Sequence, residues 1–280
     1  YMLSIHFINK NQRIMSSIIF WLIISILFLI TIITSYVLII VNHFHQKKLS
    51  EMKSDFINNM THEFKTPLST ISLASEMMFR PSINEYSYKV KRYAKVVHSE
   101  NDRLQQQVDH ILQLSALERE NLKLKIKPVQ AHRIINNQVE HFKMKLETGK
   151  GNISVNLGAD NDEILADKNH FTNVLSNLID NALKYSAENP EILVSTRSNE
   201  TGIEISVEDN GIGISNEYQK LIFKKLFRVP TGDVHDAKGF GIGLYYVKSI
   251  IEAHNGKIRL KSEPGEGSTF IIYLPYNQND

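Results

Sequence analysis

One histidine, His62, stands in a helical stretch whose neighbours could support nucleophilic chemistry. On a helix at about 100° per residue, His62 lies roughly 160° from the centre of the apolar face, so its ring points outward. A neutral imidazole is a usable nucleophile near neutral pH. Glu63 could hydrogen-bond the second ring nitrogen or accept its proton, as a general base does. A solvated surface histidine is the competing interpretation. The apolar face comprises Ile57, Met60, Phe64, Leu68, Ile71 and Met78.

Pro67 follows His62 within the same predicted helix. Proline has no N–H, so the carbonyl of Glu63, four residues back, loses its helical partner and the helix should bend just after the histidine. A proline inside a helix costs about 3 kcal/mol. A bend at this point therefore favours a functional histidine over an incidental one.

The predicted helix that begins at Asp167 carries a polar stripe of asparagines along one face. Asn173, Asn177, Asn181 and Lys184 recur at helical spacing, although asparagine is a poor helix former. Amide oxygens suit Mg²⁺, which often bridges phosphates, and a lysine pairs with phosphate as a point charge. The stripe therefore indicates ligand binding, with a plain solvated face as the alternative.

The predicted strand GIEISVED ends in a carboxylate, Asp209, and two glycines follow it at a spacing of two. A buried Asp209 could accept the amino group of adenine, while Gly211 and Gly213 would let the backbone approach the base closely. This DxGxG pattern is a weak signal on its own.

A second glycine series, Gly239, Gly241 and Gly243, opens a predicted helix, so free backbone N–H groups would face phosphate. The series lacks the preceding strand and the GxGxxG spacing of a dinucleotide fold. A third pair, Gly265 and Gly267, precedes the final strand and is also compatible with a hairpin turn.

An uncharged apolar stretch, residues 14–41, precedes all of these motifs. As a helix it would span about 42 Å, against roughly 30 Å of bilayer hydrocarbon, and it predicts a membrane-spanning helix. A signal peptide is the alternative, but the stretch has no small-residue cleavage site. Basic residues flank both ends, so charge orients the helix only weakly. Because the first residue is Tyr1, residues 1–13 are expected to be the end of an upstream segment.

Two long amphipathic helices are predicted within residues 42–120, interrupted around residues 80–82. A helical hairpin has one layer to cover its apolar stripe, so we expect a homodimer that forms a four-helix bundle. A monomeric hairpin packed on the next domain is the alternative. Residues 125–276 alternate helix and strand, which predicts a two-layer α/β sandwich.

Composition excludes two classes of site. The formal net charge of +2 offers no basic face for nucleic acid, and the absence of cysteine rules out disulfides and thiolate metal sites.

The segment FINNMTHEFKTPLSTI, residues 56–71, resembles the phosphoacceptor box of bacterial sensor histidine kinases. The order of asparagine helix, DxGxG, a lid of about 25 residues and GxGxG is similar to the ATP-binding family that groups these kinases with gyrase, Hsp90 and MutL. The resemblance implies that His62 is phosphorylated and that Thr66 positions a water or a receiver aspartate during phosphate removal. Leu226 departs from the phenylalanine usual at its lid position. For the nucleotide, the resemblance implies a site formed by Asn177, Asn181, Lys184, Tyr185, Asp209, Gly211, Gly213, Gly239, Gly241, Gly243, Leu244 and Thr269.

The implied function is autophosphorylation of His62 from Mg-ATP, with Asn181 as the Mg²⁺ ligand, followed by transfer to an aspartate of a response regulator receiver domain. The implied location is the bacterial inner membrane, with residues from about 42 onward in the cytoplasm. Two alternatives remain. A nucleotide-driven dimer clamp ATPase would need a water-activating glutamate where the helix carries Asn177. A membrane scaffold could bind ATP without turnover.

Overall fold

The computed structural model describes residues 10–79, 87–118, 124–146, 151–186, 189–229 and 241–277. The chain divides into two compact units, residues 1–55 and 56–280. The lid glycine Gly239 and the predicted interruption at residues 80–82 lie outside the described residues.

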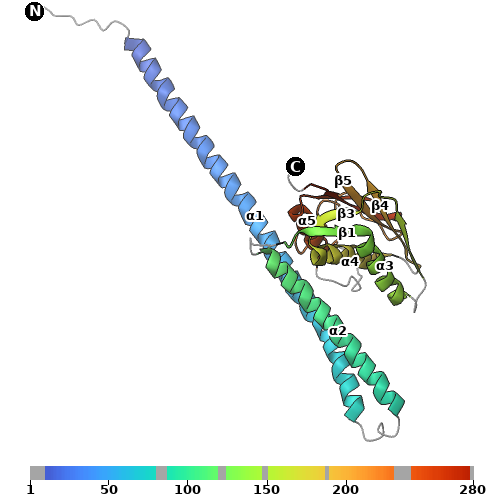
Figure 1. Ribbon diagram of the computed structural model, residues 1–280. Helices are drawn as coiled ribbons and strands as arrows, with labels where there is room; N and C mark the ends of the chain where they lie inside the picture. Colours follow the sequence, from blue (N-terminus) through green and yellow to red (C-terminus); the bar gives the residue numbers. More distant parts are fainter. Residues whose placement is uncertain are drawn as a thin grey trace, which may run out of the picture. The chain divides into compact units, whose positions relative to one another are not determined.

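A single helix, α1 (Lys10–Phe79), contains both the predicted membrane stretch and the histidine box (Figure 1). In the first unit its apolar side chains are exposed, for example Trp21 at 65% and Phe28 at 66%. The helix is long and apolar enough to cross a membrane, by length and composition. Pro67 lies inside the helix, which continues through it, and the predicted bend stays a prediction.

In the second unit, α1 pairs with α2 (Ser87–Glu118) as the predicted hairpin (Figure 1). The expected apolar face is only half covered. Pro67 and Ala74 are buried, whereas Ile57 is 61% exposed and Leu68 is 53% exposed. Ile57 and Leu68 are exposed within one chain because α2 covers a single side of α1, and their burial in a four-helix bundle stays a prediction.

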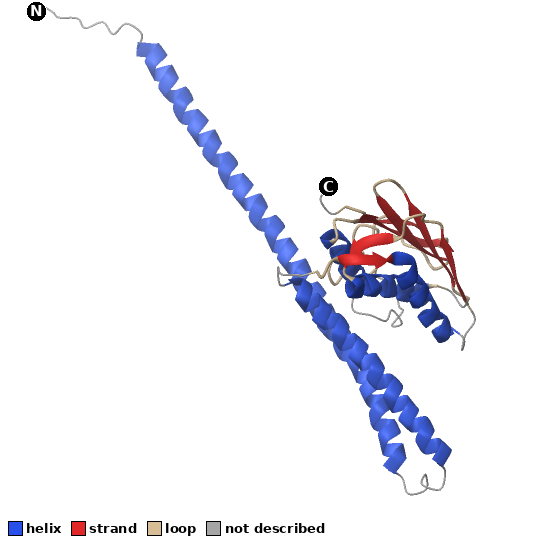
Figure 2. Ribbon diagram, in the orientation of Figure 1, coloured by secondary structure: helices blue, strands red, loops and turns tan. Residues whose placement is uncertain are grey.

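The α/β domain has two layers, with helices on one face of a five-stranded sheet (Figure 2). The sheet order is β2-β4-β5-β7-β6, and β2 runs parallel to β4 while the other pairs are antiparallel. The elements in chain order are β1 (Lys127–Gln130), α3 (Ala131–Leu146), β2 (Asn152–Leu157), β3 (Glu163–Ala166), α4 (Lys168–Tyr185), β4 (Glu191–Ser198), β5 (Gly202–Asp209), α5 (Gly243–Ala253), β6 (Lys257–Glu263) and β7 (Gly267–Pro275).

The predicted helices and long strands of this domain are confirmed, and its core is one apolar cluster between the two layers. α4 turns Phe171, Leu175 and Leu178 inward, each at most 1% exposed, and the alternating strands β4 and β5 face them. Burial of one such side chain contributes about 2 to 3 kcal/mol. The two-stranded sheet of β1 and β3 was not predicted.

Candidate active site

Asp209, the last residue of β5, is 7% exposed. Its Oδ1 accepts hydrogen bonds from the backbone N–H of Gly211 at 2.9 Å and of Ser268 at 3.2 Å. Burial raises the pKa of the Asp209 carboxyl, although these two donors act in the opposite direction. The fold therefore holds an acceptor in a fixed orientation at the strand end. Thr269 follows Ser268 on β7 and pairs with Glu208 of β5.

At the neighbouring glycines, another part of the backbone lies in the space that a side chain would need. A Cβ on Gly213 would lie 1.9 Å from the carbonyl oxygen of Glu263, and one on Gly211 would lie 2.6 Å from that of Tyr185. A Cβ on Gly267 would lie 2.0 Å from the carbonyl oxygen of Asp209. Gly213 and Gly267 also have φ of 66° and 91°, values that favour glycine. Close packing of the backbone thus explains why these three positions carry glycine.

The asparagine side chains of the stripe have different surroundings along α4. Asn173 hydrogen-bonds the phenol of Tyr246, which gives it a structural partner. Asn177 donates to the carbonyl of Asn173 at 2.8 Å, and its Oδ1 would lie 2.7 Å from a Cβ on Gly243. Within the described part of the chain, the half-buried Asn181 side chain has no hydrogen bond. Its amide oxygen is therefore available, and it suits a hard cation such as Mg²⁺.

The end of α4 meets the Asp209 loop. The backbone N–H of Ile212 donates to the carbonyl of Tyr185 at 3.1 Å, and Ser186 forms a β-bridge with Gly211. Tyr185 is 39% exposed, and Lys184 Nζ lies 5.0 Å from its ring centroid. The structure therefore brings an exposed aromatic ring and a cation to the edge of the Asp209 loop.

The second glycine series begins α5 at Gly243, as predicted. Gly241 has φ of 68°, and its carbonyl accepts from the N–H of Leu226 at 3.1 Å. Leu226 itself has φ of 62°, which is uncommon for a residue with a side chain. Leu244, in the first turn of α5, is half-buried against the core. The first turn of α5 is the helix end that a phosphate would meet.

His62 is exposed on α1, as the helical wheel predicted. Its ring makes no hydrogen bond or ion pair with any residue that the structure describes, and the Thr66 hydroxyl donates to its backbone carbonyl at 3.3 Å. The Glu63 carboxylate points to α2: Oε2 accepts from Gln107 Nε2 at 3.4 Å and lies 3.5 Å from Arg103 Nη2. The α2 partners of Glu63 were missed from the sequence, since they lie about 40 residues further along the chain.

Comparison with known proteins identifies both halves of the second unit. Residues 52–120 match the family described as "His Kinase A (phospho-acceptor) domain", and residues 166–278 match "Histidine kinase-, DNA gyrase B-, and HSP90-like ATPase". The chain belongs to the bacterial sensor histidine kinases.

The histidine kinase chain is 45% identical over 278 residues to the sensor protein RprX of Bacteroides fragilis, covering 99% of this chain and 53% of that relative. It thus spans about half the length of that protein. Two solved structures share the fold at 22% identity. Full-length ShkA in complex with AMPPNP covers 78% of this chain and 44% of its own, with a TM-score of 0.58. ThkA in complex with response regulator protein TrrA covers 81% and 62%, with a TM-score of 0.57.

A buried polar network supports α4 of this histidine kinase from behind the site. Asp167 caps the helix by accepting from the N–H groups of Asn169 and His170, and its Oδ2 accepts from the N–H of Lys125. His254, 2% exposed, accepts from the N–H of Asp167 at 2.9 Å and is bonded through Nδ1 to the carbonyl of Ile250. Burial lowers the pKa of His254. The sequence predicted the helix start at Asp167 but carried no signal for a partner 87 residues away.

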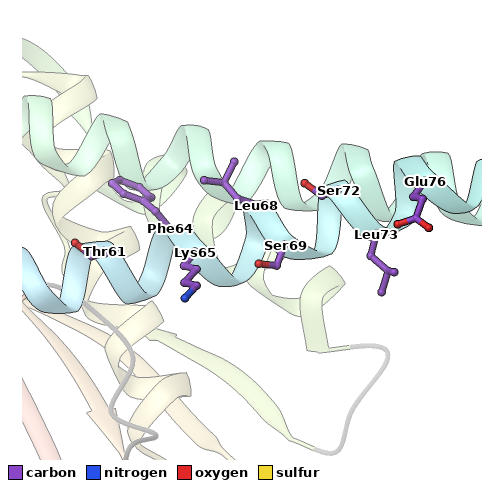
Figure 3. Close-up of a pocket in the computed structure, with 8 residues that line it drawn as sticks. All are labelled: Thr61, Phe64, Lys65, Leu68, Ser69, Ser72, Leu73 and Glu76. Carbon is purple, nitrogen blue, oxygen red and sulfur yellow. The ribbon is translucent and has the colours of Figure 1, made fainter.

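A shallow groove runs along α1 in this histidine kinase, from Thr61 to Glu76 (Figure 3). Leu68 and Leu73, 53% and 56% exposed, supply its apolar surface, and polar side chains border it. The lining residues are Thr61, Phe64, Lys65, Leu68, Ser69, Ser72, Leu73 and Glu76.

Proposed function

We propose that this chain autophosphorylates His62 from Mg-ATP and transfers the phosphoryl group to an aspartate of a response regulator. The carrying observation is that one chain combines an exposed histidine free of side-chain partners among the described residues with a buried, backbone-held carboxylate at a glycine-lined strand end. A clamp ATPase or a scaffold would leave the first of these features without a use.

The nucleotide is proposed to bind at the edge formed by α4, β5 and α5. Asp209 would accept the adenine amino group while Gly211 and Gly213 line the base, with Tyr185 alongside it. Asn177, Lys184 and the N–H groups at Gly241 and Gly243 would surround the phosphates. Gly239, Leu244 and Thr269 complete the proposed set. The AMPPNP bound by the fold relative ShkA supports this assignment.

Mg²⁺ is proposed to bind Asn181 and the phosphate oxygens, where it would neutralise charge on the transferring group. No cluster of three or more His, Cys, Asp or Glu residues suited to a metal occurs among the described residues. If the Asn181 amide and the phosphates of ATP supply the oxygen ligands, the Mg²⁺ ion would arrive together with its nucleotide.

In the proposed transfer step, His62 is the nucleophile. One ring nitrogen attacks the γ-phosphorus, the bond to the β,γ-bridging oxygen breaks, and ADP leaves with that electron pair. The proton on the other ring nitrogen passes to the Glu63 carboxylate. Thr66 is proposed to act in the reverse direction by positioning water at the phosphorylated regulator.

The assembly is proposed to be a membrane-anchored homodimer, with residues 14–41 in the inner membrane and residues from about 42 onward in the cytoplasm. Residues 42–120 would form the dimerisation and phosphotransfer hairpin, and residues 125–276 the ATP-binding domain. The half-covered face of α1 supports a second copy, because Ile57 and Leu68 would otherwise remain in water. The response regulator bound by the fold relative ThkA supports a receiver as partner.

The test is incubation of the purified chain with γ-labelled ATP. Protein-bound label that is lost in acid and stable in base supports a phosphohistidine. Release of free phosphate alone supports the clamp ATPase, and binding without either product supports the scaffold.

A further inference from the structure

A polar cluster lies between α1 and α2 beside His62, and we name it the Glu63 clasp: Glu63, Glu100, Arg103 and Gln107. Arg103 Nη2 lies 3.5 Å from Glu63 Oε2, and Arg103 Nη1 lies 3.7 Å from Glu100 Oε2. Charged N–H···O bonds usually measure about 2.7 to 2.9 Å. The Arg103 guanidinium therefore lies between two carboxylates and forms a short charged hydrogen bond with neither.

The charge of the clasp is also unbalanced. Two carboxylates share one cation, and the Glu63 and Glu100 side chains are only 16% and 23% exposed. Arg103 is 40% exposed, so it can move more freely than either acid. An arrangement of this kind has two natural closed forms, with Arg103 on Glu63 or on Glu100.

Gln107 adds a second hold on Glu63. Its Nε2 donates to Glu63 Oε2, while its own Oε1 is buried without a partner among the described residues. A buried unpaired carbonyl oxygen costs about 1 to 3 kcal/mol. The amide is retained in this orientation because turning it over would place an oxygen against the Glu63 carboxylate.

We propose that Arg103 and Gln107 of α2 are positioning residues that hold the Glu63 carboxylate of α1 away from His62. When Arg103 instead pairs with Glu100, the Glu63 carboxylate is free to turn toward His62. This rests on the proposed role of Glu63 as proton acceptor. Arg103 and Glu100 lie on the same helix, α2, whereas Glu63 lies on α1, so a small shift of α2 along α1 would change the Arg103–Glu63 distance while Glu100 stays beside Arg103. The hairpin can therefore turn a helix displacement into a change in the base available to His62.

The test compares two substitutions that should act in opposite directions. Arg103→Met removes the hold and should raise the autophosphorylation rate at saturating Mg-ATP by about two- to fivefold, the range for an ion pair of modest strength. Glu100→Gln removes the competing carboxylate and should lower that rate by a similar factor. KM for ATP should not change, because neither residue lies at the nucleotide site. Arg92→Met, an exposed arginine on the same helix, is the matched control.

A purely structural role predicts that both variants lose activity together, and either that result or no change in either would overturn the proposal. A double-mutant cycle of Glu63→Gln and Arg103→Met in thermal unfolding of the full chain tests the clasp without kinase activity. Additive changes in melting temperature would also overturn it. Absence of any label on the parent chain would instead refute the proposed function, so the two failures are distinguishable.

Discussion

The nucleotide edge and the phosphoacceptor hairpin are built by contrasting means. At the nucleotide edge, Asp209 is buried, held by two backbone donors and surrounded by glycines that leave no room for a Cβ. On the hairpin, His62 is exposed, Glu63 is held loosely by α2, and Leu68 remains half in water. The residues proposed to bind the nucleotide belong to one chain, whereas the hairpin is proposed to work with a second copy and a receiver domain. This difference fits the proposed function, in which the first region binds a small nucleotide and the second offers its histidine to other domains.

The strongest expected effect is at Gly213. Gly213→Ala would place a Cβ 1.9 Å from the Glu263 carbonyl oxygen at φ of 66°. We expect about 2 to 4 kcal/mol of destabilisation from clash and strain, with loss of Mg-ATP binding. Gly265→Ala is the control, because its φ is 84° but nothing lies within 4 Å. Calorimetric titration and thermal melting measure both effects. Equal losses in the two variants would show that strain alone matters.

The hairpin should respond to substitution through its assembly. Leu112 on α2 is 60% exposed in one chain. If a second copy covers it, Leu112→Glu buries a charge and should weaken dimerisation by at least about tenfold. Sedimentation of the detergent-solubilised chain measures this change, and Gln105→Glu adds the same charge at another exposed position of α2. Identical sedimentation of Leu112→Glu and the parent would mean that this face is not the interface.

Asp209 should show opposite effects on binding and stability. Asp209→Asn should weaken Mg-ATP binding by about ten- to a hundredfold, because a charged acceptor for adenine is lost. Burial raises the pKa of this carboxyl above its unfolded value of 3.8. Its contribution to stability is therefore full below that value and is lost as pH rises through the folded pKa. The variant should melt at or above the parent temperature at pH 7. Glu208→Gln, at the exposed neighbour, should leave binding unchanged, and a lower melting temperature for Asp209→Asn would contradict the burial argument.

The smallest expected effect concerns phosphate removal. Thr66→Ala should slow decay of the phosphorylated regulator while His62 still accepts phosphate, because the hydroxyl takes no part in attack on ATP. The hydroxyl is exposed and bonds only weakly, at 3.3 Å, to the His62 carbonyl. The measurement is decay of purified phospho-regulator with ADP present. Equal rates for mutant and parent would remove Thr66 from the reaction.

Local patterns were enough to predict much of the fold. The helix that begins after Asp167, the strand that ends at Asp209 and the glycine that begins α5 all follow from periodicity and turn chemistry. After α5 the chain turns through Asn255, with φ of 57°, and Gly256, residue types that commonly end helices. These features depend on residues that are close together in the chain.

What could not be predicted depends on distant partners. β1 and β3 are four residues each and pair across more than 30 positions, too short to show alternation. The exposure of Ile57 depends on how many helices surround α1. The pairing of Glu63 with Arg103 depends on the register of the hairpin, which hydrophobic spacing sets only to within a turn.

The most direct test of the account is phosphorylation of His62→Gln. We expect this variant to bind Mg-ATP with an affinity close to the parent's, because the His62 ring is a phosphate acceptor and not part of the proposed nucleotide site. We also expect acid-labile label from γ-labelled ATP to disappear from the protein. Binding by calorimetry and labelling by autoradiography should be measured on the same preparation. Acid-labile label retained on His62→Gln would contradict the account.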